Sequence, residues 1–211
     1  MRLYAYWRSS ASWRVRIALQ LKGLDVTIVP VNLLHSEQKG EGHRARSPLG
    51  QVPVLELADG TQLTQSLAIV QWLDATHPEP PLVPVEPLAK ARAWALAEVV
   101  NAGIQPLQNL SVLGAIDAMG GDRKEWGRQV IRDGLVGLQR LAEPHAGSFL
   151  VGDTVSVADL CLVPQLYNAR RFGVALDDLS LLTEVEARCA ALPAFQAAHP
   201  DRQPDATASR T

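Results

Sequence analysis

The stretch that decides the fold is SSASWRVRIAL, residues 9–19. It follows a short apolar run, residues 3–7 (LYAYW), which is typical of a first β-strand. Apolar positions from Trp13 to Leu21 repeat with the spacing of a buried helix. We therefore predict a strand over residues 2–6 and a helix over residues 11–22.

Ser9 and Ser10 lie at the junction between this strand and this helix, where serine is a favoured capping residue. The first turn of a helix has unpaired N–H groups and a partial positive charge. The hydroxyls, the helix start and Arg8 together make a place for a thiolate or a carboxylate. Two simpler interpretations stay open: the serines only cap the helix, and Arg14 and Arg16 lie on a solvated helix face.

The composition limits the class of protein. The chain has 211 residues, 47% hydrophobic and 20% charged, which is enough for one large domain or two modest ones. A net charge of −2 provides no overall basic field, so we expect no nucleic acid and no membrane partner. Cys161 and Cys189 form no CxxC motif and the histidines are scattered, so we expect neither disulfides nor a metal. With no signal-peptide pattern either, a reducing cytoplasm is the expected location.

The first eighty residues alternate between strand and helix patterns. Besides the strand and helix above, we predict strands over 25–31, 52–57 and 61–63, a helix over 66–76, and a loop or loose second helix over 32–50. This order indicates one α/β layer pair.

Pro53 raises a question of its own, because proline at the start of a strand gives up a ladder hydrogen bond. Such a proline belongs at an edge or beside a ligand. If the Val52–Pro53 bond is cis, the Val52 backbone turns outward and can pair with an extended peptide. Most X-Pro bonds are trans, so the pattern leaves both isomers open.

The second part of the chain has a different character. Five prolines between His77 and Pro87 indicate a linker. Helices are predicted beyond it, over 88–118, 123–142, 156–169, 178–190 and 193–198. Ser156 and Asp159 have the spacing of a capping box. The short polar tail after His199 is expected to be an extended cover or a disordered end. The expected domains are residues 1–78 (α/β), a Pro-rich linker over 79–87, and an all-helical domain over 88–211.

This architecture resembles the soluble glutathione transferase fold, a thioredoxin-like N-terminal domain followed by a helical-bundle C-terminal domain. Several short segments of the sequence look like those of the zeta class, and the resemblance covers essentially the whole chain. These segments are residues 9–19, 51–53 (QVP), 65–69 (QSLAI), 104–110 (IQPLQNL), 158–165 (ADLCLVPQ) and 199–205 (HPDRQPD).

The resemblance implies a function. Zeta-class proteins are maleylacetoacetate isomerases or, in bacterial aromatic degradation, maleylpyruvate isomerases. The sequence as a whole looks most like the maleylpyruvate isomerases of the gentisate route. It implies that glutathione is a recycled cofactor whose thiolate adds to the cis double bond, lets it rotate, and leaves the trans, fumaryl product. It also implies a homodimer. A general zeta-type transferase or dehalogenating enzyme, and a glutathione-binding module without catalysis, stay open as alternatives.

The resemblance also implies roles for individual residues. The catalytic candidates are Ser9, Ser10 and Arg8, with the serines donating hydrogen bonds to the thiolate. The cofactor-binding candidates are Ser9, Ser10, Val52, Pro53, Gln65, Ser66, Gln105 and Asn109. The substrate-binding candidates are Arg8, Arg171, Asn109 and Ser111, the arginines holding its carboxylates.

For three of these residues, an interpretation without a binding role stays open. Ser66 can be a simple helix cap, Arg171 a solvated surface residue, and Asn109 a buried hydrogen bond between helices. Asp159 is expected to be structural. We place Trp13 and Trp72 in the core and assign no site role to His35, His43 or His145.

Ala11 departs from the zeta pattern, which usually reads Ser-Ser-Cys at residues 9–11 of this chain. A cysteine nucleophile is therefore not available at this position. If the protein is active, its thiolate comes from glutathione, with the serines as hydrogen-bond donors. The departure places any cysteine-dependent side activity of relatives in doubt for this chain.

Overall fold

The computed structural model describes residues 1–206, and the chain divides into two compact units. The first comprises Met1–Leu82 together with residues 192–206, and the second is Val83–Ala191. The expected helical domain ran to the end of the chain. Instead, helix α9 (Pro193–Ala198) packs on helix α1 (Ser10–Leu21), so the last described residues belong with the first unit.

A four-stranded sheet forms the centre of the first unit, in the order β2-β1-β3-β4. Its strands are β1 (Arg2–Ala5), β2 (Thr27–Pro30), β3 (Val54–Glu56) and β4 (Gln62–Thr64). β1 runs parallel to β2 and antiparallel to β3, and β3 runs antiparallel to β4. All four predicted strands are therefore present; β1, β2 and β3 are shorter than predicted, and β4 is shifted by one residue.

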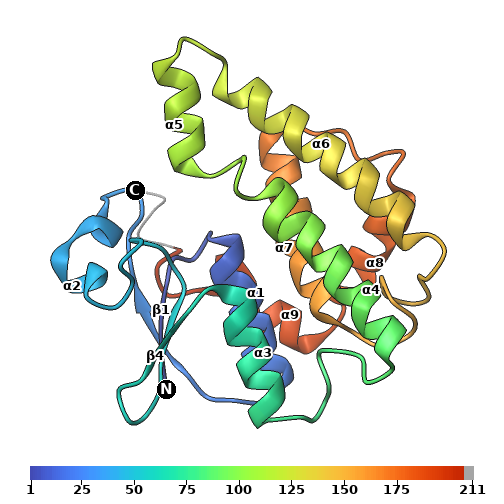
Figure 1. The fold of residues 1–211 in the computed structure, drawn as a ribbon, viewed down its shortest axis with the longest axis horizontal. Coiled ribbons are helices and arrows are strands. Elements are labelled where there is room, and N and C mark those ends of the chain that lie inside the picture. The colour runs from blue at the N-terminus through green and yellow to red at the C-terminus, as the bar shows by residue number, and fades with distance from the viewer. Residues whose placement is uncertain (207–211) are drawn as a thin grey trace. The chain divides into compact units, whose positions relative to one another are not determined.

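The two faces of the sheet follow from the alternation of side chains along β1. Tyr4 clusters with Val31 and Val54 on one face, so Leu3 and Ala5, both fully buried, point to the other. Figure 1 shows α1 and α3 (Ser66–Thr76) on one side of the sheet, and α2 (Glu41–Arg44) beyond the opposite side. The loose second helix expected in residues 32–50 is this α2, preceded by a 3₁₀ turn, η1 (Glu37–Lys39).

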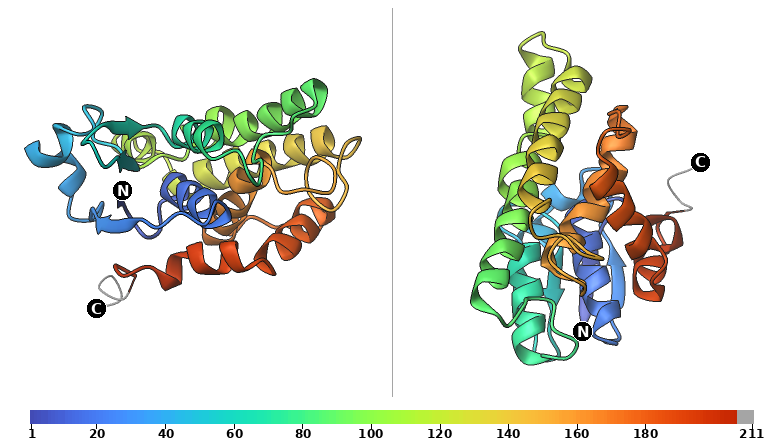
Figure 2. Two further views of the ribbon diagram at one scale, coloured as in Figure 1. Left: turned by 90° about the horizontal axis from the view of Figure 1, so that it is seen from below. Right: turned by 90° about the vertical axis from the view of Figure 1, so that its right-hand side faces the viewer.

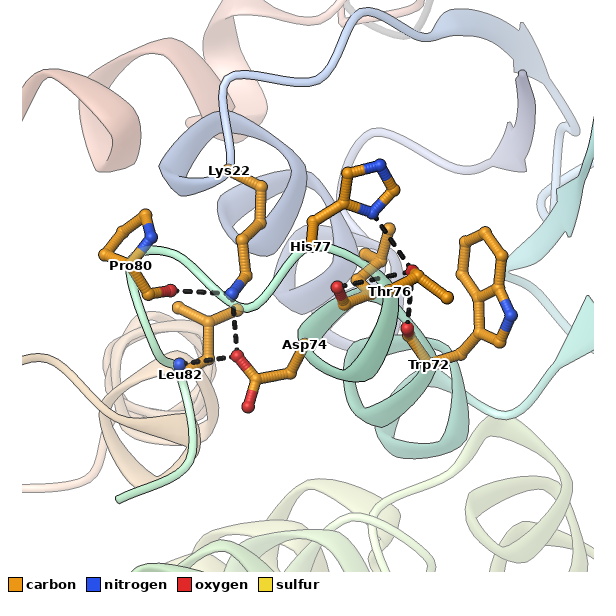
Figure 3. A network of polar contacts seen from close by, with 8 residues as sticks. Lys22, Trp72, Asp74, Thr76, His77, Pro80 and Leu82 are labelled. Atoms are coloured by element: carbon orange, nitrogen blue, oxygen red, sulfur yellow. Dashed lines mark hydrogen bonds and ion pairs between the residues drawn. The ribbon is translucent and has the colours of Figure 1, made fainter. Parts of the chain in front are cut away.

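A buried lysine ties the end of α3 to the proline-rich segment that follows it (Figure 3). Lys22 donates to the Asp74 carboxylate over 2.7 Å and to the Pro80 carbonyl over 2.6 Å. The same carboxylate oxygen accepts the Leu82 amide at 2.7 Å. Because the Lys22 ammonium is fully buried, these acceptors replace the water that it loses. The segment up to Leu82 therefore folds as part of the first unit.

The second unit consists of helices, but the pattern expected as one run over residues 88–118 is divided. It forms α4 (Pro87–Glu98), a π-helical turn η2 (Val99–Ile104) and α5 (Leu110–Ala118). Pro106 explains the break, since it cannot donate the backbone hydrogen bond that would continue the helix. The prediction of a continuous helix was wrong there.

The remaining helices of this unit match their predictions closely. They are α6 (Arg123–Ala142), α7 (Val157–Phe172) and α8 (Ser180–Ala190). Figure 2 shows α4 and α6, green and yellow, running alongside each other in both views. Glycines allow close packing on α6: a Cβ at Gly127 would lie 2.3 Å from the Phe172 ring, and one at Gly134 would lie 2.3 Å from the Ile104 side chain.

The predicted capping box at the start of α7 is confirmed. The Asp159 carboxylate accepts the Ser156 amide at 2.8 Å and its hydroxyl at 3.1 Å, and its other oxygen accepts the Leu150 amide at 3.0 Å. Burial nevertheless raises the pKa of Asp159 to about 6. Asp159 is structural, as expected, and joins the loop at Leu150 to the helix.

Candidate functional site

Ser9 and Ser10 lie where the sequence places them, at a tight turn between β1 and α1. The Ser9 amide donates to the Tyr6 carbonyl over 3.0 Å, which closes a four-residue turn, Tyr6–Ser9. Ser9 is the N-cap of α1, and its Oγ accepts the Ser12 amide at 3.2 Å. Ser10 is the first helical residue and is half-buried.

The capping role of Ser9 does not use up its hydroxyl. A serine oxygen can accept a hydrogen bond and still donate its own proton to an anion. A second hydroxyl lies one turn away: Ser12 is fully buried, and its Oγ has no hydrogen-bond partner among residues 1–206. Arg8 is half-buried, with its guanidinium 5.1 Å from the centre of the Trp7 ring. This end of the helix therefore combines a positive dipole, hydroxyl donors and a cation.

The Val52–Pro53 bond is cis, which settles the question left open by the sequence. Pairing of β3 with both neighbours begins at Val54, so the peptide groups of Val52 lie outside the ladder. Pro53 is buried and Val52 half-buried. A backbone edge of this kind can pair with an extended peptide.

Two buried side chains hold the backbone just before this bond. His43 contacts the Gln51 carbonyl through Nε2 at 2.8 Å, and the Ser47 hydroxyl accepts the Gln51 amide at 3.1 Å. The Gln51 side chain accepts a hydrogen bond from the Gln65 amide group at 3.2 Å. The sequence assigned no role to His43, because a single histidine in a polar loop gives no sign of its partner.

The start of α3 brings a buried cation to Ser66. Gln65 caps this helix with a left-handed φ of 66°, and Ser66 is 5% exposed. The Ser66 hydroxyl accepts a hydrogen bond from Arg14 Nη1 at 2.9 Å. A helix N-terminus beside a buried guanidinium favours a carboxylate.

The interpretation of Arg14 and Arg16 as a solvated helix face was wrong. Both are buried, with Arg14 fully enclosed and Arg16 3% exposed. Charged residues are rarely buried without polar partners, and both of these have them. Trp13 is core as expected, whereas Trp72 is only half-buried.

In the second unit, the remaining candidates lie on or near α5 and α7. Gln105 donates to the buried Gln165 side chain over 3.3 Å. Asn109 is exposed and caps α5, accepting the Ser111 amide at 3.2 Å and its hydroxyl at 3.3 Å, so it is not a buried hydrogen bond between helices. Arg171 is exposed and donates to Asn168 over 3.3 Å.

Arg170, next to Arg171, is engaged differently. It forms a two-pronged ion pair with Glu186, with N–O distances of 2.6 and 2.5 Å. The Arg170 guanidinium is therefore already paired with a carboxylate of the same unit. Within residues 1–206, no cluster of three or more His, Cys, Asp or Glu is arranged to hold a metal, and no helix is long and apolar enough to cross a membrane.

Comparison with known proteins identifies the family. Residues 3–81 match the family model of the glutathione S-transferase N-terminal domain. The chain is 44% identical to mouse maleylacetoacetate isomerase over 98% of this chain and 95% of that one. It is 47% identical to maleylacetoacetate isomerase of Rhizobium meliloti over 95% of this chain and 96% of that one. The chain belongs to the zeta class of glutathione transferases.

Solved structures of this family agree with the fold. Maleylacetoacetate isomerase from Anaeromyxobacter dehalogenans, with glutathione bound in its active site, has a TM-score of 0.89 at 52% identity, with 97% of each chain covered. A zeta-class maleylpyruvate isomerase has a TM-score of 0.93 at 37% identity, with 97% of this chain and 99% of that one covered. The predicted glutathione transferase fold, with its thioredoxin-like domain and helical second part, is confirmed.

Proposed function

We propose that this protein is a glutathione-dependent cis–trans isomerase that converts maleylpyruvate to fumarylpyruvate in bacterial gentisate degradation. The observation that carries the proposal is the anion site at the start of α1: a helix N-terminus with the Ser9 hydroxyl free to donate, directly preceded by Arg8 in the same turn. It occurs in a chain of the zeta class, whose curated relatives are named as isomerases.

The residues of the first unit fit glutathione. The peptide groups of Val52 offer an edge for its backbone, and the start of α3, with Ser66 and the buried Arg14, offers a place for its γ-glutamyl carboxylate. Gln65, at the cap of α3, lies beside this place. We assign Val52, Pro53, Gln65 and Ser66 to cofactor binding on these grounds.

Bound glutathione supplies a thiol whose reversible addition to the substrate double bond permits rotation about it. The task of Ser9 and Ser10 is to stabilise the thiolate. Lowering a thiol pKa from about 8.5 by about two units requires roughly 2.7 kcal/mol. A helix terminus contributes about 0.3–1 kcal/mol and a hydrogen bond to a charged group about 1.5–3 kcal/mol, so the two together suffice.

The substrate is a dicarboxylate, and the arginines are its proposed partners. Arg8 lies within the turn Tyr6–Ser9, directly before the serines, and Arg171 is exposed on α7. A guanidinium holds a carboxylate through two parallel hydrogen bonds. Asn109 and Ser111 at the start of α5, and Gln105 before it, are proposed as further polar contacts to cofactor or substrate.

Maleylacetoacetate is the second candidate substrate, favoured by the higher identity to isomerases of that name. Both names occur among relatives from Pseudomonas aeruginosa PAO1, at 42% and 43% identity, so these two relatives do not separate the substrates. We also propose a homodimer of the 22.9 kDa chain, which light scattering tests directly.

An absorbance assay of the purified protein tests the proposed reaction. Maleylpyruvate and maleylacetoacetate are each supplied with and without glutathione. Faster glutathione-dependent conversion of maleylpyruvate supports the proposal, and faster conversion of maleylacetoacetate selects the second candidate. Conversion of neither, with glutathione still bound, points to a general transferase, a dehalogenating enzyme or a module without catalysis.

A further inference from the structure

The turn that carries Arg8 and Ser9 is held by two side chains that lie outside it. The Trp7 amide donates to Asp205 Oδ2 over 2.9 Å, across a separation of 198 residues. The Trp7 carbonyl accepts Arg16 Nη2 at 2.8 Å. Both polar groups of the Trp7 backbone are therefore bound by side chains, one from α1 and one from the end of the chain.

We call Asp205 and Arg16, with their bonds to the Trp7 backbone, the clamp. Arg16 also contacts the first residue of the turn and the end of α9. Its Nη1 lies 3.5 Å from the Tyr6 carbonyl, the same oxygen that accepts the Ser9 amide at 3.0 Å. Its Nε donates to the Ala198 carbonyl at the end of α9 over 3.2 Å. Burial lowers the pKa of Arg16 to about 9, and the nearby Asp205 carboxylate opposes this shift. Arg16 therefore remains a cation at neutral pH.

The end of the chain also packs against the turn through apolar contacts. Tyr6, Trp7 and Ala206 form one buried cluster, and Val52 packs against it. The cluster thus connects the turn before α1 with the residue that precedes the cis proline. Two separate parts of the candidate glutathione site share this support.

We propose that Asp205 and Arg16 are positioning residues that hold the turn Tyr6–Ser9 in the geometry that Arg8 and Ser9 need to bind the thiolate and the substrate carboxylate. They act through the Trp7 peptide groups and touch neither ligand. This inference rests on the proposed function. A misplacement of about 1 Å in a catalytic group can cost about a hundredfold in rate, so small movements of this turn matter.

The test compares three full-length variants. Asp205→Ala removes the acceptor for the Trp7 amide, and Asp205→Asn keeps an acceptor oxygen while removing the charge. Asp201→Ala is the matched control, because Asp201 lies in the same segment and its carboxylate faces His199. The measurements are the thiol pKa of bound glutathione by ultraviolet absorbance, kcat and KM separately, and thermal unfolding. Hydrogen exchange of the Trp7 and Ser9 amides is measured without glutathione.

Asp205→Ala is expected to raise the thiol pKa of bound glutathione by about one unit, to lower kcat/KM about tenfold or more, and to speed exchange at both amides. Asp205→Asn should recover most of this loss, and Asp201→Ala should match the unsubstituted protein. Asp205→Ala with a lower unfolding temperature but unchanged thiol pKa, kcat and exchange would overturn the proposal, because Asp205 would then be merely structural.

Failure of the proposed function gives a different result. In that case the unsubstituted protein converts neither maleylpyruvate nor maleylacetoacetate, whether or not it binds glutathione. The exchange rates then decide the inference alone: faster exchange at Trp7 and Ser9 in Asp205→Ala supports the clamp, and unchanged exchange refutes it.

Discussion

The candidate residues of the two units are held in place by different means. In the first unit, partners come from far along the chain: Ser66 is bound by Arg14, 52 residues away, and the Trp7 amide by Asp205, 198 residues away. In the second unit, Asn109 is bound within its own helix start by Ser111, and Arg171 donates to Asn168, three residues before it. Gln105, bound by the buried Gln165, is the exception.

Burial differs in the same way. Arg14, Ser66 and Pro53 are buried, whereas Asn109, Ser111 and Arg171 are exposed. Long-range hydrogen bonds between buried groups restrict a site to one arrangement. The difference indicates that the proposed cofactor site in the first unit is preformed and that the polar groups proposed in the second are more adjustable. Substitutions in the first unit should therefore affect binding and stability together, and those in the second should affect binding alone.

The largest expected effect comes from Ser9→Ala. It removes the proposed donor to the thiolate, worth about 1.5–3 kcal/mol, so kcat/KM should fall roughly ten- to a hundredfold. Loss of the cap should also lower the free energy of unfolding by about 1 kcal/mol. Ser10→Ala, measured beside it by the same glutathione-dependent assay and urea unfolding, separates the two serines. Full turnover in both variants would show that neither serine holds the thiolate.

Arg14→Gln should rank next. It weakens the buried hydrogen bond to Ser66, so the KM for glutathione should rise and the free energy of unfolding should fall by about 1–3 kcal/mol. A double-mutant cycle with Ser66→Ala checks the contact, with an expected coupling of about 0.5–3 kcal/mol. Additive effects of the two substitutions would contradict a preformed cofactor site built on this pair.

Arg171→Ala should weaken substrate binding without loss of stability. The KM for the dicarboxylate should rise about tenfold, because one charged hydrogen-bond partner is lost. The free energy of unfolding should change by less than about 0.5 kcal/mol, as for most exposed positions. Arg170→Ala is the matched control, since its guanidinium is paired with Glu186. An equal rise in KM for both variants would count against the assignment of Arg171.

The smallest expected effect is a pH dependence of stability from Asp159. Its folded-state pKa of about 6 lies above that of an exposed aspartate, so the folded protein binds the extra proton. This contribution to stability is complete below about pH 4 and is lost as the pH rises to about 6. Urea unfolding between these values should show the decline, and Asp159→Asn should flatten it while lowering stability through the weakened capping box. A slope that persists in the variant would assign it to another group.

Local patterns predicted much of this fold. Helices over 66–76, 123–142 and 193–198 match the structure because their starts and apolar spacing are local signals. The run over 88–118 failed at Pro106, where a helical apolar pattern continues across a break in the backbone. A periodic pattern records which side chains are apolar and not whether each peptide group finds a partner.

The sequence pointed to the candidate site most directly where its residues are adjacent. Arg8, Ser9 and Ser10 form one short segment, and Gln65 and Ser66 form another. The partners of Arg14, His43 and Asp205 were not predictable, because each partner lies on another element. A buried arginine and a solvated one look the same until the tertiary fold places an acceptor beside it.

The buried lysine at the end of α1 bears on how this chain can be recombined with its relatives. Lys22 reaches past α3 to the Pro80 carbonyl and shares Asp74 with the Leu82 amide. A chimaera joined at His77 would take the Pro80 carbonyl and the Leu82 amide from the other protein. It would keep the Lys22 ammonium and the Asp74 carboxylate that bind them here. A junction placed after Leu82 transfers the complete set, so the proline-rich segment should travel with the first unit in any exchange of halves.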